Sequence, residues 1–486
     1  MTKSSYTPTI GIECHVQLNT ATKLFSGADN DARDKSPNTT VSPLCFGMPG
    51  ALPVVNEAAI SLAIRAGIAL KAKIPQLSRF ERKHYFYPDL PLGYQITQLA
   101  EPIIGAGRVE VPLPDGSSKV VRIHHAHLEA DAGKLTHPSG ADYSLVDYNR
   151  AGTPLIEIVS EADMHSPAEA KAYAQELYQL MTFAGVTDGD LYHGNMRFDI
   201  NVSVSTTDEL GTRTETKNLN SFRSVEKAAE YEIKRQIALL EKGHEITQET
   251  RGWDEAKQQT FSQRSKEDAH DYRYFPDADI PPIRVESSVV ESIRSKMPTL
   301  PHEYRQNFQV LQLDSTVILA LMQSRSHCEL VQRLIDGNHV ATARRTALWL
   351  AMLSADQSAD ELIQNSDKPQ IPDDYYIELG EMVERQEVHS SAAKQIFIEM
   401  RSTHESPRHI AKQKNLLQLS DTSEIEAIVT AILDDPSNQK SIEDIRSGNE
   451  RAIGFLVGQV MKQSQGKANP QIATTLLKER IHKESS

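Results

Sequence analysis

Cysteine is scarce in this sequence of 486 residues, which contains only Cys14, Cys45 and Cys328. No two of them form a Cys-x-x-Cys pair, so neither a disulfide framework nor a cysteine zinc site is expected, and a reducing compartment fits. No apolar run approaches the roughly 20 residues of a membrane helix. The first residues, MTKSSYTPTIGIE, carry neither an apolar signal core nor the arginine-rich pattern of a transit peptide. These absences predict a cytoplasmic protein with no membrane association.

The familiar phosphate-binding motifs are also absent. The sequence has no GxxxxGK[ST] loop, no GxGxxG between a predicted strand and helix, and no GxSxG nucleophile turn. A bound nucleotide would therefore need a different arrangement of side chains. The net charge of −14 argues against broad, non-specific binding of nucleic acid, although it does not exclude a local contact.

Alternating polar and apolar residues predict strands in much of the first 290 residues. IGIECHVQL (residues 10–18) places its apolar side chains on one face, and RFDINVSVS (residues 197–205) does the same. Apolar residues recur at helical spacing over 56–75, 166–185 and 221–243. Because alternating faces outnumber continuous apolar runs, the pattern favours an α/β or α+β fold with a largely antiparallel sheet.

The character of the sequence changes after a proline-rich stretch near residue 290. Strand signals vanish there and helical periods take over, and a second break follows near THESPRHIAKQ (residues 403–413). We therefore expect three domains: a sheet-containing domain over 1–290, a helical domain over 291–405 and a helical tail over 406–486.

The first cluster that could carry chemistry combines carboxylates with one histidine on strands. Glu13 and His15 share a strand face about 7 Å apart, which is close enough to hold one ion. Glu129, Glu157 and Asp199 lie in similar settings. Mostly oxygen ligands with one histidine suit Mg²⁺ or Mn²⁺ better than zinc. The alternative is the solvated polar face of a half-exposed sheet.

The second cluster lies in GTRTETKNLNSFR, where a polar strand passes into a predicted helix. It brings together two cations and two amides, Lys217, Asn218, Asn220 and Arg223. Free backbone N–H groups and the helix dipole favour an anion at such an N-terminus. The alternative is plain capping of the helix by Asn220 or Ser221.

Two loops rich in aromatic and charged residues form the third cluster. FERKHYFYPDLPLGYQIT (residues 80–97) and DYRYFPDADIPP (residues 271–282) both contain prolines, which prevent regular structure. Tyrosine rings exclude water while their hydroxyls remain polar, and arginine binds phosphate or carboxylate in a bidentate way. Such loops suit the walls of a pocket for a polyanionic ligand, although each could instead plug the edge of a domain.

Seven long motifs follow one another along nearly the whole chain: IGIECHVQL, PGALPVVN, RKHYFYPDLPLGYQITQ, HLEADAGK, DYNRAGTPLIEIVSE, GTRTETKNLNSFR and DYRYFPDADIPP. Together they resemble the B subunits of the aspartyl/glutamyl-tRNA(Asn/Gln) amidotransferases. The stretch AIGFLVGQVMKQSQGKANP resembles the helical tail of the same family.

The resemblance implies an ATP-dependent carbon–nitrogen ligase of translation. Members of the family activate the side-chain carboxylate of mischarged Glu-tRNA(Gln) or Asp-tRNA(Asn) as an acyl phosphate, which ammonia converts to the amide. The ammonia comes from glutamine in a partner amidase (glutaminase) chain, the A subunit, and a small C subunit completes a heterotrimer. The implied cofactors are ATP and Mg²⁺. The implied fold is α+β, with an antiparallel-sheet cradle, an all-helical linker domain and a helical tail that holds tRNA.

The family's motifs also imply roles for particular residues of this chain. The metal-site motifs match Glu13, His15, Glu129 and Glu157, of which the last three are the expected direct ligands. Catalytic roles are implied for Lys83, Tyr85, Asp89 and Asp199. Contacts with the nucleotide or the acceptor end of tRNA are implied for Tyr87, Asn201, Lys217, Asn218, Asn220, Arg223, Arg273 and Tyr274.

The chain departs from the family's pattern at a few positions. Ala130 stands where the family often has a second glutamate, and Leu92 stands where many members have lysine. If these charges line the ammonia tunnel in other members, the tunnel of this chain has lost both and is more apolar. Met196 and Phe198 are unusual in their motif. Some members bind zinc through paired cysteines before PGALPV, but only Cys45 remains here, so no zinc is expected.

Two alternatives compete with the ligase. A tRNA-binding scaffold with degraded chemistry would have no need of the metal-site residues, which this chain retains. The glutamate-specific archaeal relative carries a large inserted domain, for which this length leaves no room. Nothing in the sequence resembles an amidase nucleophile, so glutaminase activity is expected from another chain. Glu-tRNA(Gln), Asp-tRNA(Asn) or both stay open as substrates.

Overall fold

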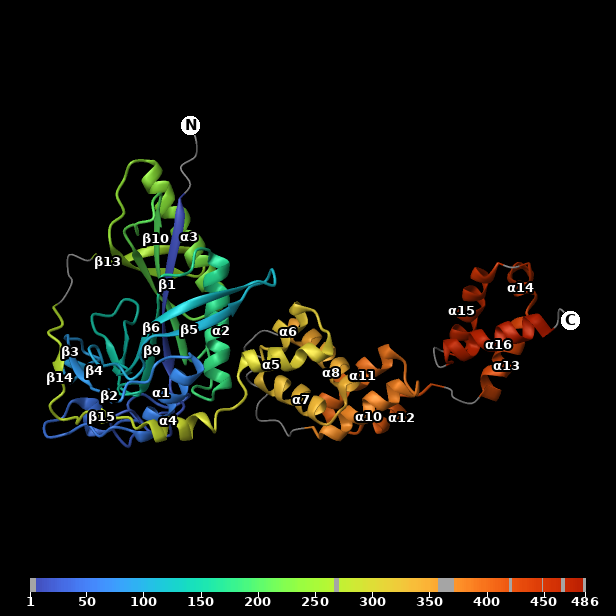
Figure 1. Cartoon of the computed structure of the whole chain (residues 1–486), viewed down its shortest axis with the longest axis horizontal. Helices are drawn as coiled ribbons and strands as arrows, with labels where there is room; N and C mark the ends of the chain where they lie inside the picture. The colour runs from blue at the N-terminus through green and yellow to red at the C-terminus, as the bar shows by residue number, and fades with distance from the viewer. Residues whose placement is uncertain are drawn as a thin grey trace. The chain divides into compact units, whose positions relative to one another are not determined.

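The computed structural model describes residues 6–265, 271–356, 371–418, 422–447, 449–464 and 468–483 (Figure 1). Contacts divide the chain into two compact units, Met1–Gln306 and Asn307–Ser486. All of the described strands belong to the first unit, whereas the described part of the second unit is helical. The expected α+β class, with strands first and helices after them, is confirmed.

The strands of the first unit are β1 (Thr7–Gln17), β2 (Leu77–Ser78), β3 (Glu81–His84), β4 (Tyr94–Thr97), β5 (Gly107–Pro112), β6 (Ser118–Ala130), β7 (Lys134–Thr136), β8 (Leu145–Asp147), β9 (Pro154–Ser160), β10 (Met196–Ser205), β11 (Thr214–Leu219), β12 (Glu249–Asp254), β13 (Gln259–Ser265), β14 (Phe275–Pro276) and β15 (Ile283–Arg284). Its helices are η1 (Pro43–Phe46), α1 (Glu57–Ala69), α2 (Pro167–Phe183), α3 (Phe222–Glu241), α4 (Ser287–Arg294) and α5 (Pro301–Asn307).

Eight strands form one sheet in the order β13–β12–β11–β10–β1–β9–β6–β5. Every neighbouring pair is antiparallel except β11–β12, which is parallel. The predicted, largely antiparallel sheet is therefore confirmed. The first strand of the chain lies inside the sheet, between β10 and β9, which are both much later in the sequence.

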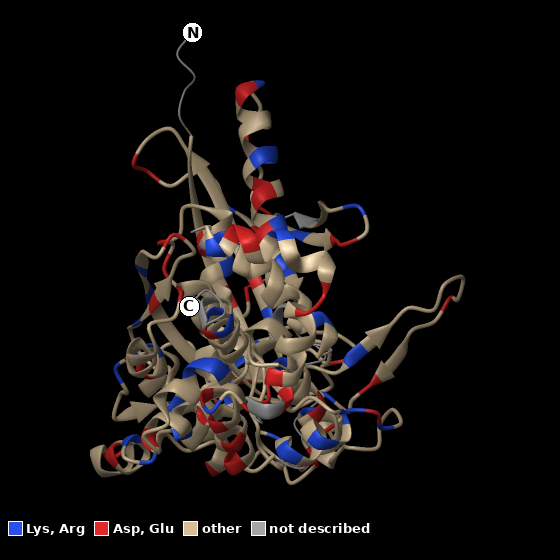
Figure 2. Ribbon diagram, turned by 90° about the vertical axis from the view of Figure 1, so that its right-hand side faces the viewer, with Lys and Arg blue, Asp and Glu red and all other residues tan. Residues whose placement is uncertain are grey.

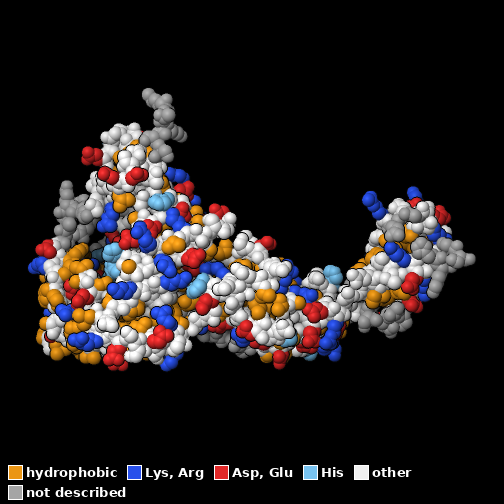
Figure 3. Space-filling view, viewed as in Figure 1, with side chains coloured by type: hydrophobic (Ala, Val, Ile, Leu, Met, Phe, Trp, Pro, Cys, Tyr) orange, Lys and Arg blue, Asp and Glu red, His pale blue; other side chains and the backbone are white. Residues whose placement is uncertain are grey.

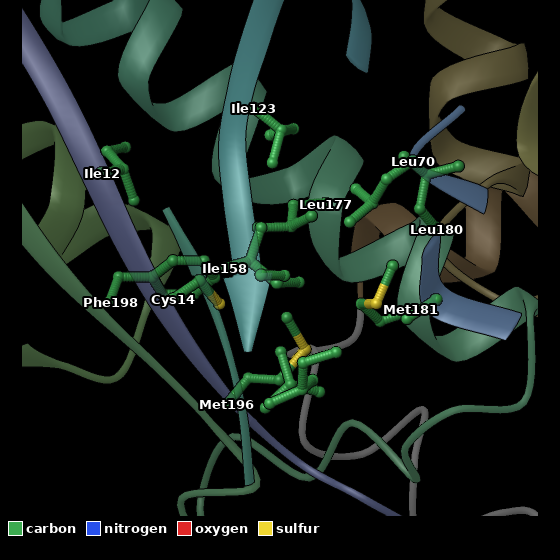
Figure 4. Close-up of a cluster of buried hydrophobic side chains, with 14 of the residues drawn as sticks. Ile12, Cys14, Leu70, Ile123, Ile158, Leu177, Leu180, Met181, Met196 and Phe198 are labelled. Atoms are coloured by element: carbon green, nitrogen blue, oxygen red, sulfur yellow. The ribbon is translucent and has the colours of Figure 1, made fainter. Parts of the chain in front are cut away.

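One face of this sheet carries the core of the first unit. Cys14 of β1, Ile158 of β9 and Phe198 of β10 lie in one buried cluster with Leu177 and Met181 of α2 (Figure 4). Of these, Cys14 and Phe198 are residues that alternation assigned to the apolar face. Burial of a large apolar side chain contributes about 1.5–3 kcal/mol, so the alternation fixes which face of the sheet turns inward.

Two of the expected helices begin at the caps that the sequence indicates. The Asn56 side chain accepts a hydrogen bond from the N–H of Ala58 at the start of α1, and Ser166 accepts one from Glu169 at the start of α2. The prediction that the first helix extends to residue 75 is wrong, because α1 ends at Ala69. The chain turns at Lys71, with a positive φ of 50°, and continues in a non-helical path beside the sheet.

The two aromatic loops meet in a small sheet of their own. β14 pairs with β3, and β3 pairs with β4, so the order is β14–β3–β4. β14 comes from the loop at residues 271–282, whereas β3 and β4 come from the loop at residues 80–97. Segments that lie far apart in the sequence therefore form one wall.

The second unit contains η3 (Phe308–Leu311), α6 (Ser315–Leu321), α7 (Arg325–Asp336), α8 (Val340–Asp356), α10 (Asp373–Glu384), α11 (Ser390–Thr403), α12 (Pro407–Gln413), α13 (Thr422–Leu433), η4 (Pro436–Asn438), α14 (Gln439–Arg446), η5 (Glu450–Ala452), α15 (Ile453–Gln463) and α16 (Pro470–Lys483). Helices α13 to α16 share a core of their own, in which Val429, Leu456 and Leu477 are fully buried. The domain boundaries near residues 290 and 405 remain predictions.

Basic residues (blue) and acidic residues (red) are interspersed along the ribbon in the view of Figure 2. Within the described ranges, every helix is too short or too polar to cross a lipid bilayer.

Candidate functional site

Three neighbouring strands carry a row of polar side chains on the face of the sheet opposite α2. The register pairs His15 of β1 with Glu157 of β9, and Glu157 with His127 of β6. Glu129 follows His127 by two residues and therefore lies on the same face. The sheet thus brings together residues from three separate motifs.

Both imidazoles of this row converge on the two carboxylates. His15 Nε2 lies 3.5 Å from Glu157 Oε2 and 3.5 Å from Glu129 Oε1. His127 Nε2 lies 3.4 Å from Glu157 Oε2 and 3.7 Å from Glu129 Oε2. His127 and Glu129 are buried, and the other two are half-buried. We call these four residues the imidazole cluster.

Contacts within this cluster shift the pKa values of His15, His127 and Glu157. Burial alone would lower the pKa of His15 and His127, but the neighbouring carboxylates outweigh it and raise each pKa to about 9. Burial would likewise raise the pKa of Glu157, but the two histidines hold it well below its usual value. The cluster therefore combines carboxylate oxygen donors with two imidazoles. The imidazoles would release their protons to solvent when a metal ion binds.

A second cluster lies beside the first on the same face. The register pairs Glu13 of β1 with Asp199 of β10, and Glu215 of β11 completes a group whose ligand atoms all lie within 4.8 Å of one another. Asn201 donates from Nδ2 to Glu13 Oε1 at 3.0 Å. Lys217 Nζ lies 2.9 Å from Glu215 Oε1 and 3.4 Å from Asp199 Oδ2. We call Glu13, Asp199 and Glu215 the oxygen cluster.

The two clusters fit divalent cations by their donor chemistry. His15, Glu129 and Glu157 also form a group whose ligand atoms lie within 4.8 Å of one another. Oxygen donors are those that Mg²⁺ prefers, and imidazole with carboxylate suits transition ions as well. Burial, with neighbouring carboxylates, raises the pKa of Glu13, as expected where acidic groups gather in one place. The structure thus assigns Glu13 to the oxygen cluster and not to the group of His15.

An ion-paired aspartate borders the imidazole cluster. Asp131 Oδ2 accepts a hydrogen bond from Arg150 Nη2 at 2.7 Å and lies 3.4 Å from Arg197 Nη2. Burial would raise the pKa of Asp131, but the two arginines lower it. Arg197 is the β10 partner of His15 in the sheet, so it also faces the site. Sequence reasoning gave no role to this network.

The two aromatic loops, residues 80–97 and 271–282, form a wall that we call the aromatic wall. It places the polar ends of lysine and tyrosine side chains near the imidazole cluster. Lys83 Nζ lies 4.9 Å from the centre of the Tyr272 ring and 5.8 Å from that of Tyr85. Burial, followed by the charge of Glu129, raises the pKa of Tyr85 and of Tyr274. Of the residues expected in the pocket wall, Lys83, Tyr85 and Tyr274 lie together here, and their roles remain predictions.

Several other expected residues lie at the surface. Tyr87, Asn220, Arg223 and Arg273 are all exposed. Ser221, whose side chain accepts from the N–H of Ser224, caps α3, so the capping alternative holds for Ser221 and not for Asn220.

Asn218 is tied to the oxygen cluster through its backbone. Its N–H donates to Asp199 Oδ1 at 2.8 Å, and its φ of 62° turns the chain at the end of β11. An asparagine tolerates this left-handed conformation better than most residues.

Two functional candidates were missed in the sequence. His127 precedes Glu129 by two residues, which is the same spacing that singled out Glu13 and His15. Glu215 was recognised as part of a polar strand but not as a metal ligand. The i, i+2 spacing was a usable signal for His127, whereas the register that joins Glu215 to Asp199 cannot be read from one strand.

Comparison with known proteins gives consistent results over the whole length. A model of the GatB/GatE catalytic domain matches residues 8–291, and a model described as the GatB domain matches residues 337–481. The chain belongs to the GatB family. It is 45% identical over 485 residues to the B subunit of the aspartyl/glutamyl-tRNA(Asn/Gln) amidotransferase of Alcanivorax borkumensis, covering 97% of this chain and 98% of that protein.

Two further relatives carry the same name. The protein of Caldanaerobacter subterraneus subsp. tengcongensis is 43% identical over 484 residues, covering 98% of this chain and 100% of the relative. That of Halorhodospira halophila is 43% identical over 481 residues, covering 97% and 98%. The family proposed from the motifs is therefore confirmed.

Leu92 and Ala130, two residues at which this chain departs from the pattern of the GatB family, line the same cavity. Its volume is about 40 Å³, and its lining also includes Asp89, Gln95 and Asp131. Gln95 donates from Nε2 to the carbonyl of Ala130 at 2.9 Å, which fixes the wall next to Glu129. Burial raises the pKa of Asp89. The cavity thus reaches from the proline-rich loop to the edge of the imidazole cluster.

Cys45 also lines this cavity and is engaged by a buried lysine. Lys23 donates from Nζ to Cys45 Sγ at 3.4 Å and to the carbonyl of Ala151 at 2.7 Å. Burial would raise the pKa of the thiol, but hydrogen bonds from Ser42 and the charge of Lys23 lower it. The ammonium of Lys23 thus lies next to Cys45, the one cysteine that this chain keeps before the PGALPV motif.

Exposed apolar side chains surround the same loops. Phe46, Met48 and Phe86 are 41%, 54% and 76% exposed. Figure 3 shows hydrophobic side chains gathered over the lower left of the first unit, where β2, β3, β14 and β15 lie. Gly47 permits the close approach of these loops, because a Cβ atom there would lie 2.7 Å from the carbonyl oxygen of Pro91.

A separate polar cleft of about 450 Å³ adjoins the other side of the Asp131–Arg150 pair. Arg33, Lys134, Arg150 and His193 line it together with several aspartates and asparagines. Arg150 thus faces this cleft, while its partner Asp131 faces the small cavity.

Proposed function

We propose that this chain activates and amidates the side-chain carboxylate of glutamate or aspartate esterified to tRNA, with ATP and ammonia as co-substrates. The observation that carries this proposal is the pair of cation-type clusters on one sheet face, beside a wall of half-buried tyrosines. The chain matches the models of the GatB/GatE catalytic domain and the GatB domain, and 97–98% of it aligns with relatives named as the B subunits of such amidotransferases.

The proposed reaction has two steps. An oxygen of the substrate carboxylate attacks the γ-phosphorus of ATP, and ADP leaves with the electrons of the broken P–O bond. Ammonia then attacks the carbonyl carbon of the acyl phosphate. The C–O bond to phosphate breaks, and the proton lost by nitrogen leaves with the phosphate.

Charge in the site suits the first step. Phosphoryl transfer needs positive charge around the phosphate oxygens and little covalent help from the protein. Divalent cations held by the two clusters would supply this charge. Lys83, which has no carboxylate partner among the described residues, would contact a phosphate, while Lys217 orients the oxygen cluster.

The walls suit the second step, because an acyl phosphate must be protected from water. The rings of Tyr85, Tyr272 and Tyr274 contact one another, and Tyr85 and Tyr274 lie close enough to Glu129 for its charge to raise their pKa. Burial keeps Tyr85 and Tyr274 protonated, since it raises their pKa. Both hydroxyls can therefore donate hydrogen bonds to a phosphate or carbonyl oxygen.

The small cavity provides a path for uncharged ammonia. Its lining includes Leu92 and Ala130, whose apolar side chains favour a neutral solute over ammonium, and Ala130 is the chain neighbour of Glu129. We infer that a partner amidase supplies the ammonia and docks on the exposed apolar loops around Phe46 and Phe86. We further propose that a small third chain joins this complex and that the tail binds the charged tRNA. The reaction would take place in the cytoplasm.

The test uses this chain co-purified with the amidase and the small third chain from its own source. Glu-tRNA(Gln), Mg²⁺, γ-labelled ATP and ammonium chloride are supplied, and amide and phosphate are followed. The proposal predicts equal amounts of both products, and loss of both in His15→Ala. Binding of tRNA without ATP turnover would instead favour the scaffold that carries no chemistry.

A further inference from the structure

The imidazole cluster is close to symmetric about Glu157. His15 and His127 are its cross-strand neighbours on the two sides, and their Nε2 atoms lie 3.5 and 3.4 Å from the same oxygen, Oε2. Glu129 turns one oxygen toward each imidazole, with Oε1 near His15 and Oε2 near His127. His127 therefore lies in the same position relative to Glu129 and Glu157 as His15, which is a predicted ligand.

The separations in this cluster resemble those between ligands of one ion. All four nitrogen–oxygen distances lie between 3.4 and 3.7 Å. Hydrogen bonds of this type are shorter, at about 2.7–3.2 Å. A tetrahedral ion with bonds of about 2.1 Å places its ligands about 3.4 Å apart. The side chains thus surround a common space instead of bonding closely to one another.

A supporting residue orients His127. His127 Nδ1 lies 3.2 Å from His125 Nε2, and His125 Nδ1 lies 2.7 Å from His124 Nδ1. An irregular register between Ile123 and His125 turns His124 and His125 toward each other. If each ring donates outward along this row, the Nε2 lone pair of His127 points to the carboxylates. Ligating histidines ordinarily have such a partner on their other nitrogen.

We propose that His127 is a ligand of the cation in the imidazole cluster, alongside His15, Glu129 and Glu157. Two imidazoles and two carboxylates favour a first-row transition ion over Mg²⁺, which takes oxygen ligands and keeps much of its water. The adjacent oxygen cluster contains carboxylates only and suits Mg²⁺. The site therefore separates two kinds of divalent cation across neighbouring positions of β1.

The experiment counts nitrogen ligands with Mn²⁺ as the probe. The full chain, co-purified with its partner chains, carries Glu215→Gln to disable the oxygen cluster. Electron spin-echo envelope modulation then reports the ¹⁴N nuclei coupled to bound Mn²⁺. We expect two histidine nitrogens in this background and one after addition of His127→Gln. A single coupled nitrogen before that substitution overturns the proposal, and this measurement does not depend on whether the His127 variant folds.

Affinity supplies the second readout. Titration of free Mn²⁺, with Mg²⁺ as competitor, is expected to give Mn²⁺ binding at least about tenfold weaker in His127→Gln, with Mg²⁺ affinity changed less than about threefold. His244→Gln, at an exposed histidine just after α3, is the matched control and should change neither affinity. Equal losses for both ions, or none for Mn²⁺, contradict the proposal. Because no step measures amidation, failure of the proposed function would appear separately.

Discussion

The two units of the molecule differ in the acidic, basic and imidazole groups that they bury. The first unit buries carboxylates such as Glu129, Asp199 and Glu232 as well as the cation of Lys23. In the described part of the second unit, His327 is the only buried side chain of this kind. Buried charge is costly without partners, so its concentration in the first unit indicates which part of the molecule gives up packing stability for chemistry.

Two buried histidines illustrate the difference. His127 lies among carboxylates, which overcome the effect of burial and raise its pKa to about 9. His327 lies beside Arg401, whose charge adds to burial and lowers the pKa of His327 to about 3. Its Nε2 is 3.4 Å from Arg401 Nη2. Neighbouring charge, and not depth, therefore distinguishes a metal-type histidine from one that belongs to a packed helical core.

The largest effect is expected from Glu157→Gln, which removes the charge at the centre of the imidazole cluster. Amidation should fall by about 100-fold or more, because a bound cation contributes several kcal/mol of charge stabilisation. Glutaminase activity of the assembled complex should stay nearly unchanged, since the proposed function assigns it to another chain. Glu230→Gln on the exposed face of α3 is the control. Equal loss of both activities in Glu157→Gln would contradict a local role for this carboxylate.

Removing the tail tests whether the second unit contributes binding only. Deletion of residues 406–486 should raise the KM for charged tRNA by about tenfold and change kcat much less, because lost binding that is equal in the ground and transition states appears in KM. Steady-state kinetics over a range of tRNA concentrations would measure both. An unchanged KM would remove the tRNA role proposed for this region.

The small cavity allows two opposite charges to be added at Leu92 and Ala130, where the chain departs from the pattern of its family. Ala130→Glu alone should destabilise the protein by about 1–3 kcal/mol, because it places a carboxyl near Asp131 without a partner. Leu92→Lys alone should also destabilise it. The double variant should recover about 1 kcal/mol through the pair. Thermal unfolding of the four proteins measures this coupling, and strictly additive losses would mean that the two side chains do not meet.

The smallest expected effect concerns acid stability of the second unit. His327 is neutral when folded and gains a proton on unfolding below pH 6.5, so its contribution is complete above that pH and is lost as pH falls toward 3. The loss approaches about 1.4 kcal/mol per pH unit. His327→Gln should therefore flatten the decrease in stability between pH 6.5 and 5.

The two tryptophans make this measurable. The chain has only Trp253 and Trp349, one in each unit, and Trp349 packs near Phe397 with ring centres 5.1 Å apart. Unfolding followed by fluorescence in a Trp253→Phe background reports the second unit alone. The same pH slope with and without His327 would show that another group controls acid sensitivity.

Local patterns predicted the elements of the fold well where periodicity was strong. Alternation in β1 and β10 assigned Cys14 and Phe198 to the buried face, and Ser166 marked the start of α2. Two-residue strands such as β2 and β14 carry no periodic signal, so they were read as loops. The early end of α1 depends on the left-handed turn at Lys71. Lysine rarely adopts this conformation, so the sequence does not predict a turn there.

The candidate site was predicted as a set of residue types but not as an arrangement. The i, i+2 spacing of Glu13 and His15 suggested one site, yet the sheet places a different neighbour beside each of them. Register between β1, β9 and β10 decides this, and register is a property of the assembled sheet. The same limit explains why His127 and Glu215 entered only with the structure.

The position of β1 inside the sheet has a consequence for synthesis on the ribosome. Its partners β9 and β10 emerge only after roughly another 140 residues or more, so the nascent first strand waits unpaired for about 10–40 s at ordinary elongation rates. During that time its alternating Ile10, Ile12 and Val16 remain open to wrong partners. A chaperone that shields the emerging N-terminal segment should therefore raise the yield of this chain more than one that acts after release.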